Sequence, residues 1–567
     1  MRNNSPSRLY FLAGIFFLAG LFLAGKLFFI QIVFGTEYRE TAERQYSQSL
    51  GRTFNRGSIF LSAKSGTLVS GATLATGYIL AINPSLLTNP QAIYDKLHQV
   101  LPDLDEEQFK IKSRRRSDPY EEVAARLTES AAAGVRALKL PGVEIIEESY
   151  RSYPGRTLAA HVLGFMGYQG NIYAGRYGLE KQYEEVLSRS GEVTFATFLA
   201  ELFSGPIQGR AAGGLGGDLV IAIEPKVQQF LEDELETIMA KWQSRAAGGI
   251  ILDPKTGAVL AMAARPAFDP GEKQTDLSLL VNPLVERVYE MGSIMKPLTL
   301  AAGLDAGAVS EDTYYTDLGS LVVENKIINN YDGQARGRVP LQEILNQSLN
   351  TGAVFVMQQL GRERFRQYLD DFGLGQKTGI DLPGETKGLV ANLDSGREIE
   401  SATAAFGQGI AVTPLNITVA LSALANGGQL FKPRLVERIR YTTGVIEELP
   451  PATGRQVIKT DTARRITAML VKVVDEVLDG GRARLEHYRV AAKTGTAQIP
   501  RSDGQGYETD KFLHSFFGYF PAEAARFSVF LYAMEPTGAK YASQTLTLPF
   551  SRLAKFLLNY YQVPPDR

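Results

Sequence analysis

A serine and a lysine three positions apart constrain this chain more than any other feature of its sequence. Ser293 and Lys296 stand in the stretch Tyr289–Pro297, which precedes a run of helix-forming residues. Side chains three apart on a helix share one face, so these two can meet. Proline is tolerated in the first helical turn, so Pro297 places the start of the helix close to Ser293. A serine there, beside an amine that can take its proton, has the outline of an activated nucleophile.

Two polar motifs further along the chain offer groups that suit the same chemistry, Ser348-Leu349-Asn350 and Lys493-Thr494-Gly495-Thr496. The three motifs together predict acyl transfer through a serine ester, in which Ser293 attacks a carbonyl carbon and neutral Lys296 accepts the proton. Free lysine titrates at about 10.4, so burial or a neighbouring cation must lower the pKa of Lys296. Lys493 is suited to be that cation and to attract an anionic substrate.

The remaining motif residues have roles that follow from their functional groups. Ser348 is suited to relay a proton to the leaving amine, and Asn350 to hold Lys296 or a substrate amide.

The second motif adds substrate-binding groups. Thr494 and Thr496 offer hydroxyl groups to a carboxylate, and Gly495 lacks a Cβ, which would let a substrate backbone lie against the strand. We expect the N–H groups of Ser293 and Thr496 to form an oxyanion hole, where one donor contributes about 2.7–4 kcal/mol in other enzymes.

Composition excludes several other functions. The chain has 567 residues, no cysteine, and four histidines without metal-ligand spacing. Disulfides and thiolate metal sites are therefore excluded, and we expect neither a metal centre nor a cofactor. A formal net charge of −1 argues against nucleic-acid binding.

The N-terminus carries a long apolar stretch. Leu9 to Gly25 contains only apolar residues, glycine and one tyrosine, and after Lys26 the apolar character continues to Phe34. The stretch is long enough to cross a hydrocarbon core of about 30 Å. Arg2 and Arg8 precede it, so the positive-inside rule keeps the N-terminus in the cytoplasm. We therefore expect a cytoplasmic tail at 1–8 and a single-pass anchor at 9–34 in the cytoplasmic (inner) membrane, with everything after it outside. A cleaved signal peptide, the alternative, normally has a shorter apolar core.

The rest of the chain divides at the glycine-rich stretch Gly213–Gly217, which is typical of a flexible linker. Residues 35–217 contain no plausible nucleophile and base, so we interpret them as a non-catalytic pedestal. Residues 218–567 carry all three motifs. The expected fold is α+β: an antiparallel sheet flanked by helices, with strands from both ends of this domain and a closing helix that includes residues 553–560. Strands are predicted at 218–223, 249–252, 259–262, 488–498, 515–520 and 527–534.

With these residues in place, the chain resembles the class B penicillin-binding proteins. The order of its three motifs is the signature shared by penicillin-binding proteins and class A β-lactamases. Further matches lie at 372–380, 406–410 and 425–428, and in the N-terminal half at Arg56-Gly57, Arg151–Pro154 and Gly178–Glu180. The chain departs from the family pattern at Leu61-Ser62, where an acidic-basic pair is common, and at Ala492, where glycine is common.

The resemblance implies a membrane-anchored peptidoglycan D,D-transpeptidase with a pedestal (dimerisation-type) domain and a β-lactamase-like transpeptidase domain. Its substrates would be the D-alanyl-D-alanine ends of peptidoglycan stem peptides, and β-lactams would acylate it covalently. It also implies a multi-spanning glycan polymerase partner within the division or elongation machinery. The early position of Ser293 and the compact stretch 84–150 favour septal wall synthesis, with lateral-wall synthesis as the alternative.

Two other functions are alternatives for a chain with these motifs. A β-lactamase shares the chemistry, but those are short soluble chains, and Glu343–Asn346 imitates a class A lactamase element only at the wrong place in the order. A β-lactam sensor or a catalytically silent scaffold of the wall-synthesis machinery is the alternative from another class, and the intact motifs argue against the silent scaffold.

Overall fold

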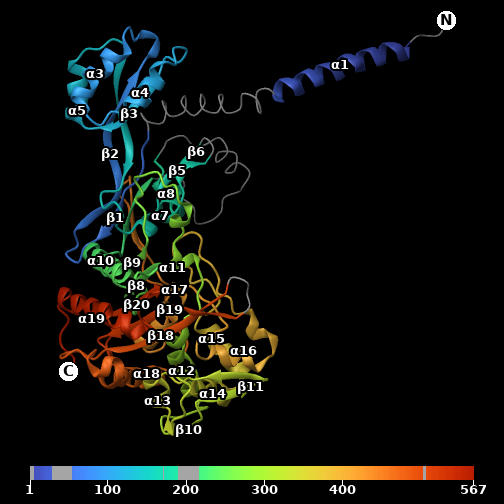
Figure 1. The fold of residues 1–567 in the computed structure, drawn as a ribbon, viewed down its shortest axis with the longest axis vertical. Coiled ribbons are helices and arrows are strands. Elements are labelled where there is room, and N and C mark those ends of the chain that lie inside the picture. The colour runs from blue at the N-terminus through green and yellow to red at the C-terminus, as the bar shows by residue number, and fades with distance from the viewer. Residues whose placement is uncertain (1–4, 29–53, 170–171, 190–215, 502–505) are drawn as a thin grey trace.

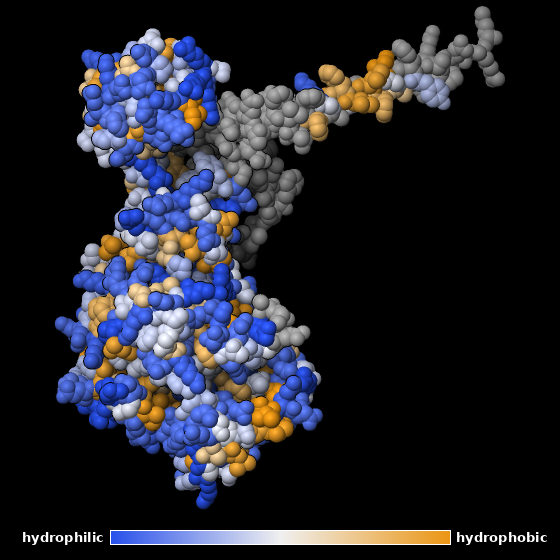
Figure 2. Space-filling view, viewed as in Figure 1, coloured by the Kyte–Doolittle hydropathy of each residue, from blue (hydrophilic) through white to orange (hydrophobic). Residues whose placement is uncertain are grey.

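The protein has a small head, a narrow waist and a larger body arranged along one axis (Figures 1 and 2). The computed structural model describes residues 5–28, 54–169, 172–189, 216–501 and 506–567.

Helix α1 (Ser5–Phe28) covers most of the apolar N-terminal stretch. It exposes large apolar side chains, among them Phe16, Phe17 and Phe22, which give it the hydrophobic colouring of Figure 2. Within the ranges that the structure describes, no helix combines the length and the apolar character needed to cross a membrane. Residues 29–34 of the expected anchor lie outside those ranges.

The head packs three helices on strands at the far end of the molecule from the body (Figure 1). Its small core includes Leu80 and Ile82 from the sheet and Leu97 and Phe109 from the helices. The sequence predicts mainly helix over residues 91–138, and the structure confirms this except for β3. The head elements are α3 (Pro90–Val100), α4 (Glu106–Ser113), β3 (Glu121–Leu127), α5 (Glu129–Ala137) and β4 (Val143–Ser152).

One seven-stranded sheet runs from the head through the waist, in the order β16-β15-β7-β1-β2-β3, with β4 also paired to β2. Strand β2 (Leu68–Ile82) is its longest member, with 15 residues, and links head to waist. The other strands are β1 (Ile59–Ser62), β7 (Gly217–Ile221), β15 (Val436–Tyr441) and β16 (Ile446–Glu448).

This sheet overturns one sequence-based assignment. The strand predicted at 218–223 forms as β7, but it does not belong to the catalytic sheet: it lies parallel to β1 and antiparallel to β15. The prediction was wrong because a short, almost wholly buried apolar strand carries no sign of which partner it pairs with. The hydrogen-bonded sheet therefore crosses the expected boundary between 217 and 218. Residues 213–215 of the expected linker lie outside the described residues.

A buried ionic cluster holds the waist together. Arg56 and Arg151 each place Nε 2.6 Å from a different oxygen of the Glu180 carboxylate, and all three side chains are at most 2 % exposed. Arg56 also contacts Glu184, and Arg151 donates to the Gly57 carbonyl at 2.8 Å. The three N-terminal segments that carry the family resemblance thus meet here. Their contacts join separate segments of the waist, and the non-catalytic character of this region stays a prediction. Glu180 lies in α7 (Gly178–Gln182) and Glu184 begins α8 (Glu184–Leu187). The neighbouring elements along the chain are α6 (Ala160–Leu163), β5 (Met166–Gln169) and β6 (Ile172–Gly175).

The body is built on a five-stranded antiparallel sheet in the order β18-β19-β20-β8-β9. As predicted, its strands come from both ends of the domain. They are β8 (Ala246–Leu252), β9 (Val259–Arg265), β18 (Ala491–Pro500), β19 (Tyr507–Phe520) and β20 (Phe527–Met534).

Alternating side chains of these strands serve two different cores, as the pleat requires. Phe516 joins α10 (Pro225–Trp242) and the predicted closing helix α19 (Ala542–Tyr560) on one face. Phe517 joins the helices around Ser293 on the other. The helices on that face are α11 (Pro283–Glu286), α12 (Lys296–Asp305), α13 (Gln342–Asn346), α14 (Asn350–Leu360), α15 (Arg362–Asp371), α16 (Glu398–Ala404), α17 (Pro414–Ala425) and α18 (Thr460–Lys472).

Small two-stranded sheets decorate the body: β10 (Tyr314–Asp317) with β13 (Gly337–Pro340), β11 (Ser320–Val323) with β12 (Lys326–Asn329), and β14 (Gln429–Leu430) with β17 (Arg455–Gln456).

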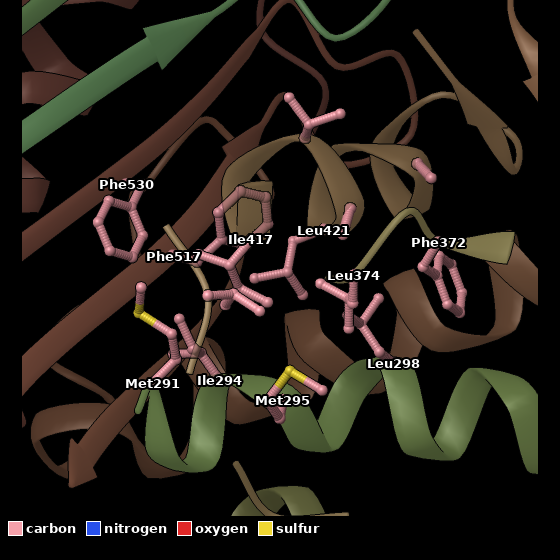
Figure 3. Close-up of a cluster of buried hydrophobic side chains, with 14 of the residues drawn as sticks. Met291, Ile294, Met295, Leu298, Phe372, Leu374, Ile417, Leu421, Phe517 and Phe530 are labelled. Atoms are coloured by element: carbon pink, nitrogen blue, oxygen red, sulfur yellow. The ribbon is translucent and has the colours of Figure 1, made fainter. Parts of the chain in front are cut away.

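The segment that carries the nucleophile is anchored by its apolar side chains. Met291, Ile294, Met295 and Leu298 point into a cluster with residues of α17 and of β19 and β20 (Figure 3). Most of α12 is buried, which is the property of a helix enclosed on all sides. The catalytic segment is therefore part of the core, so its polar groups are held in fixed positions.

Candidate active site

Ser293 lies in a single 3₁₀ turn, Gly292–Met295, that leads directly into α12. The helix begins at Lys296 with Pro297 in its first turn, which confirms the predicted helix start. The predicted contact is also present, because Lys296 Nζ lies 3.0 Å from Ser293 Oγ. The nucleophile and its candidate base are thus within hydrogen-bond distance before any substrate binds.

Ser348 completes the surroundings of the Lys296 amine. Its carbonyl oxygen lies 2.5 Å and its hydroxyl oxygen 3.1 Å from Nζ. The backbone of Ser348 is left-handed, with φ of +53°, a conformation that side chains other than glycine adopt at a cost. This turn points both oxygens of one residue at the same amine.

Lys493, on β18, reaches the same hydroxyl from the other side. Its Nζ lies 3.2 Å from Ser348 Oγ and 3.1 Å from the Thr494 carbonyl oxygen. The Ser348 hydroxyl therefore lies between two lysine amines and forms a continuous path from Lys493 through Ser348 to Lys296 and Ser293.

Burial determines the electrostatics of this path. It lowers the pKa of Lys296 well below the ordinary value, and the charge of Lys493 lowers it further. Burial also lowers the pKa of Lys493, to about 8. The sequence argument named Lys493 as one possible cause for Lys296, and the structure makes desolvation the larger one. Two causes lower the pKa of Lys296 and one lowers that of Lys493, so the neutral form is favoured more at Lys296, the amine beside Ser293 Oγ.

A cavity of about 940 Å³ opens over these groups. Most of the predicted residues line it, whereas Lys296 and Gly495 lie behind its wall. The lining includes Ser293, Ser348, Asn350, Lys493, Thr494 and Thr496. This volume is within the range of sites that enclose a small ligand or a short peptide end.

The structure does not show one of the two roles considered for Asn350, and it contradicts the role predicted for Gly495; the substrate role of Asn350 stays a prediction. The amide of Asn350 donates to the Asn329 carbonyl at 2.8 Å, so it is engaged by β12 and is not bonded to Lys296. A Cβ on Gly495 would lie 2.3 Å from Ser515 Oγ and 2.6 Å from the Met291 carbonyl oxygen. The missing side chain therefore faces the protein and not the substrate. Glycine is needed because the strand passes so close to the nucleophile turn.

Thr496 and the nucleophile turn lie side by side. A Cβ on Gly292 would come within 3.2 Å of the Thr496 carbonyl carbon, and Thr496 Oγ1 accepts a hydrogen bond from the Ala542 N–H at 3.0 Å. The hydroxyl proton of Thr496 thus remains available for a substrate. The oxyanion role of the Ser293 and Thr496 N–H groups stays a prediction.

Sequence reasoning missed other residues of the cavity wall. Four of them come from segments without a motif, and only tertiary structure brings them here: Asn330, Glu400, Tyr507 and Tyr541. Gln408 also lines the cavity and belongs to the family match at 406–410, but no role was predicted for it.

A serine paired with a buried lysine of lowered pKa, at the floor of a cavity with a second lysine, defines the class of serine acyl-transferases that use lysine as the base.

Comparison with known proteins gives the family. The family described as the penicillin-binding protein transpeptidase domain matches residues 247–552, and the penicillin-binding protein dimerisation domain matches residues 55–196. The chain belongs to the penicillin-binding proteins of class B, which combine these two domains.

Individual relatives agree with this. Stage V sporulation protein D of Bacillus subtilis is 32 % identical over 92 % of this chain and 80 % of its own length. Peptidoglycan D,D-transpeptidase FtsI of Escherichia coli is 26 % identical over 78 % of this chain and 73 % of its own. Penicillin-binding protein 3 of Mycobacterium tuberculosis, solved in complex with aztreonam, has a TM-score of 0.68 at 24 % identity and covers 91 % of this chain and 98 % of its own.

Proposed function

We propose that this protein is a serine D,D-transpeptidase that cross-links peptidoglycan stem peptides through an acyl-serine intermediate. The observation that carries the proposal is the arrangement of four side chains: Lys296 Nζ within 3.1 Å of both the Ser293 and the Ser348 hydroxyl oxygens, with Lys493 on the far side of Ser348. Relatives with the same two domains, among them one named peptidoglycan D,D-transpeptidase, support the substrate class.

Acylation follows from these positions. Ser293 Oγ attacks the carbonyl carbon of the penultimate D-alanine while the neutral Lys296 amine takes the hydroxyl proton. Ser348 passes a proton to the nitrogen of the terminal D-alanine, whose bond to the carbonyl carbon breaks, and free D-alanine leaves. Backbone N–H groups beside Ser293 are suited to stabilise the oxyanion that develops.

Transfer repeats the steps with a different nucleophile. An amine of a second stem peptide attacks the acyl-serine ester, its proton passes to the Ser348–Lys296 pair, and the Ser293 oxygen leaves and is reprotonated. The product is a peptide bond between two stems. A β-lactam acylates Ser293 through the carbonyl carbon of its cyclic amide. After the lactam ring opens, the leaving nitrogen remains covalently attached to the acyl group, so it does not make way for the amine of a second stem peptide.

The substrate-binding side uses charge. The α-carboxylate of the terminal D-alanine and the carboxylate of a penicillin both carry the negative charge that Lys493 attracts, and the Thr494 and Thr496 hydroxyl groups can donate to it. The stem-peptide carboxylate and the penicillin carboxylate would therefore bind to the same three side chains.

The experiment is labelling with fluorescent penicillin followed by peptide mapping. The label is expected on Ser293 and is expected to disappear in Ser293→Ala. Ser543 lines the same cavity without a lysine three residues on, so Ser543→Ala is the matched control and should label normally. Label that persists in Ser293→Ala would refute the assignment.

A second measurement separates the enzyme from a β-lactam sensor or a silent scaffold. Purified protein supplied with nascent glycan strands should release D-alanine and form dimeric cross-linked stems, and Ser293→Ala should do neither. A sensor would acylate with penicillin and still release no D-alanine from stems. A β-lactamase would release the hydrolysed penicillin within seconds, where the transpeptidase stays acylated.

We further propose that the apolar N-terminal segment at 9–34 anchors the enzyme in the cytoplasmic membrane with the catalytic body outside. A membrane-embedded glycan polymerase is the expected partner, and septal wall synthesis the expected setting. The compact head between residues 84 and 150 supports the septal over the lateral-wall alternative. A fluorescent fusion is expected at mid-cell and in the membrane fraction; a dispersed peripheral signal would favour the lateral wall.

A further inference from the structure

Glu290, three residues before Ser293, has a carboxylate whose partners come from two distant segments. The Tyr507 hydroxyl lies 3.3 Å from one carboxylate oxygen and 3.0 Å from the other, and the Gly409 N–H donates to Oε1 at 3.1 Å. The side chain is only partly exposed, so these contacts replace most of the water that an acidic group on the surface would have.

The Gly409 contact belongs to a close approach between two loops. The Gly292 N–H donates to the Gly407 carbonyl at 3.0 Å. Gly407 has φ of +82°, and a Cβ there would come within 2.2 Å of the Gly292 carbonyl oxygen. The backbone of residues 406–410 therefore lies directly against the turn that carries Ser293, and Glu290 ties the two together from the other end.

The Tyr507 contact reaches the opposite wall. Tyr507 begins β19, which pairs with β18, the strand that carries Lys493 and Thr496. Tyr507 also lines the cavity. Glu290 thus contacts both the loop behind the nucleophile turn and the strand pair that faces the cavity.

We propose that Glu290 is a positioning residue for the acyl-transfer reaction: its ionised carboxylate holds the Ser293 turn against the 406–410 loop and against Tyr507, and so fixes Ser293 Oγ relative to Lys296 and Lys493. The inference rests on the proposed function of Ser293. It assigns to Glu290 no contact with the substrate.

The charge state of Glu290 gives the proposal a pH signature. Burial raises the pKa of Glu290 to about 7, even though the bonds from Tyr507 and Gly409 lower it. Protonation turns one acceptor oxygen into a donor, which weakens the hold on two donor groups. The other titratable groups nearby are Tyr507 itself, whose pKa is raised by burial and by Glu290, and Glu400 of α16, which faces Tyr507. Lys296 and Lys493 share the site.

The test measures the rate of acylation by a fluorescent penicillin between pH 6 and pH 8.5 in the full chain and in four variants. At pH 8 we expect Glu290→Gln and Tyr507→Phe each to lower the rate by about tenfold, the loss of one hydrogen bond to a charged group. Because both remove the same contact, the double variant should be no slower than the slower single variant. Tyr314→Phe, which removes an exposed hydroxyl from β10, is the matched control and should leave the rate unchanged.

The pH profile separates positioning from general loss of structure. The wild-type rate should fall as pH is lowered through about 7 and approach that of Glu290→Gln, so the ratio of the two rates should shrink. A structural defect would give a constant ratio. Thermal unfolding of each variant provides the folding control.

Several outcomes would overturn the proposal. These are a Glu290→Gln rate within about twofold of wild type at pH 8, a constant ratio across the pH range, or losses that multiply in the double variant. If one of these outcomes is found and Ser293→Ala is not labelled by penicillin, the proposed function stands and only this inference fails. If Ser293→Ala still labels, the proposed function fails as well.

Discussion

Two groups of buried cations in this protein, one in the waist and one in the body, differ in their electrostatics: the pKa of Arg56 in the waist is raised, and that of Lys296 in the body is lowered. In the waist, Arg56 and Arg151 clasp the Glu180 carboxylate, with every side chain nearly inaccessible to water. In the body, Lys296 and Lys493 are buried to the same degree, but the contacts described above join them to hydroxyl and carbonyl oxygens.

The difference appears in the pKa values. Burial alone would lower the pKa of Arg56, but Glu180 and Glu184 raise it above its ordinary value. For Lys296, burial and the charge of Lys493 act in the same direction, and the pKa falls. A buried base with a carboxylate partner stays a permanent ion, whereas one with neutral oxygens becomes able to exchange protons.

The comparison shows that burial by itself does not decide whether a cation stays charged. The partner and the type of cation decide it. Arginine, which stays protonated, forms the structural cluster, and lysine, whose pKa shifts readily, forms the reactive one. Each of the following predictions changes one side of that comparison.

The largest effect is expected when the side chain at position 296 is made permanently charged. Lys296→Arg keeps a positive charge at the site but removes the amine that can deprotonate at usable pH. Acylation by penicillin should fall by about 10²–10⁴-fold, the range for loss of a general base. Circular dichroism should show a folded protein. A rate within about tenfold of wild type would move the base role to another group.

The next largest effect is expected on the free energy of unfolding, when the carboxylate is removed from the waist cluster. Glu180→Gln removes the carboxylate that Arg151 contacts and leaves Arg56 with Glu184 alone, and breaking a buried ion pair in this way costs about 3–5 kcal/mol. Urea unfolding measures the free energy directly. Glu486→Gln, at a surface glutamate, is the control and should change it by less than about 0.5 kcal/mol. If both variants unfold alike, the cluster does not stabilise the waist.

Raising the pH should weaken the reactive pair selectively. The pKa of Lys493 is about 8, so its charge is present below that pH and is lost as pH rises through it. Acylation by an anionic penicillin should therefore decline above pH 8, approaching about tenfold per pH unit. The methyl ester of the same penicillin carries no carboxylate and is the control, with a much weaker decline. Parallel profiles for the acid and the ester would contradict a role for the Lys493 charge in binding.

The smallest effect is expected when one arginine of the waist becomes a lysine. Arg151→Lys keeps the charge beside Glu180 but loses the second guanidinium nitrogen, which donates to the Gly57 carbonyl oxygen. We expect a loss of about 1 kcal/mol in the free energy of unfolding, the size of one hydrogen bond. Arg482→Lys, on an exposed side chain, should be neutral by the same assay. A loss as large as that of Glu180→Gln would mean that geometry and not charge holds the cluster.

Much of the body could be predicted from sequence because its signals are local. Asp253–Gly257 contains the proline and glycine of a turn, which predicts a hairpin of the strands expected at 249–252 and 259–262, and β8 and β9 pair across it. The contact of Ser293 with Lys296 follows from helical spacing alone. Lys493 could be placed only by its motif, because it lies far along the chain.

The remaining features depend on contacts between distant segments. Gly495 has its missing Cβ against Met291 and Ser515, and no local pattern gives that direction. Tyr507 meets Glu290 across 217 positions of sequence. Strand β7 was assigned to the wrong sheet for the same reason, since its partner β1 lies more than a hundred residues earlier. The membrane anchor and the septal role stay predictions.

Strand β2 makes the head of this molecule a mechanical arm. Its 15 residues extend over about 50 Å at the usual rise per residue. Because β2 is hydrogen-bonded to β1, and β1 through β7 to β15, a force applied to the head is transmitted as torque to backbone beside the catalytic body. The part of β2 beyond its pairing with β1, residues 73–82, extends about 33 Å, so a rotation of about 5° at the waist would move its far end by about 3 Å. A partner that grips the head can therefore exert leverage on the enzyme from far outside its cavity.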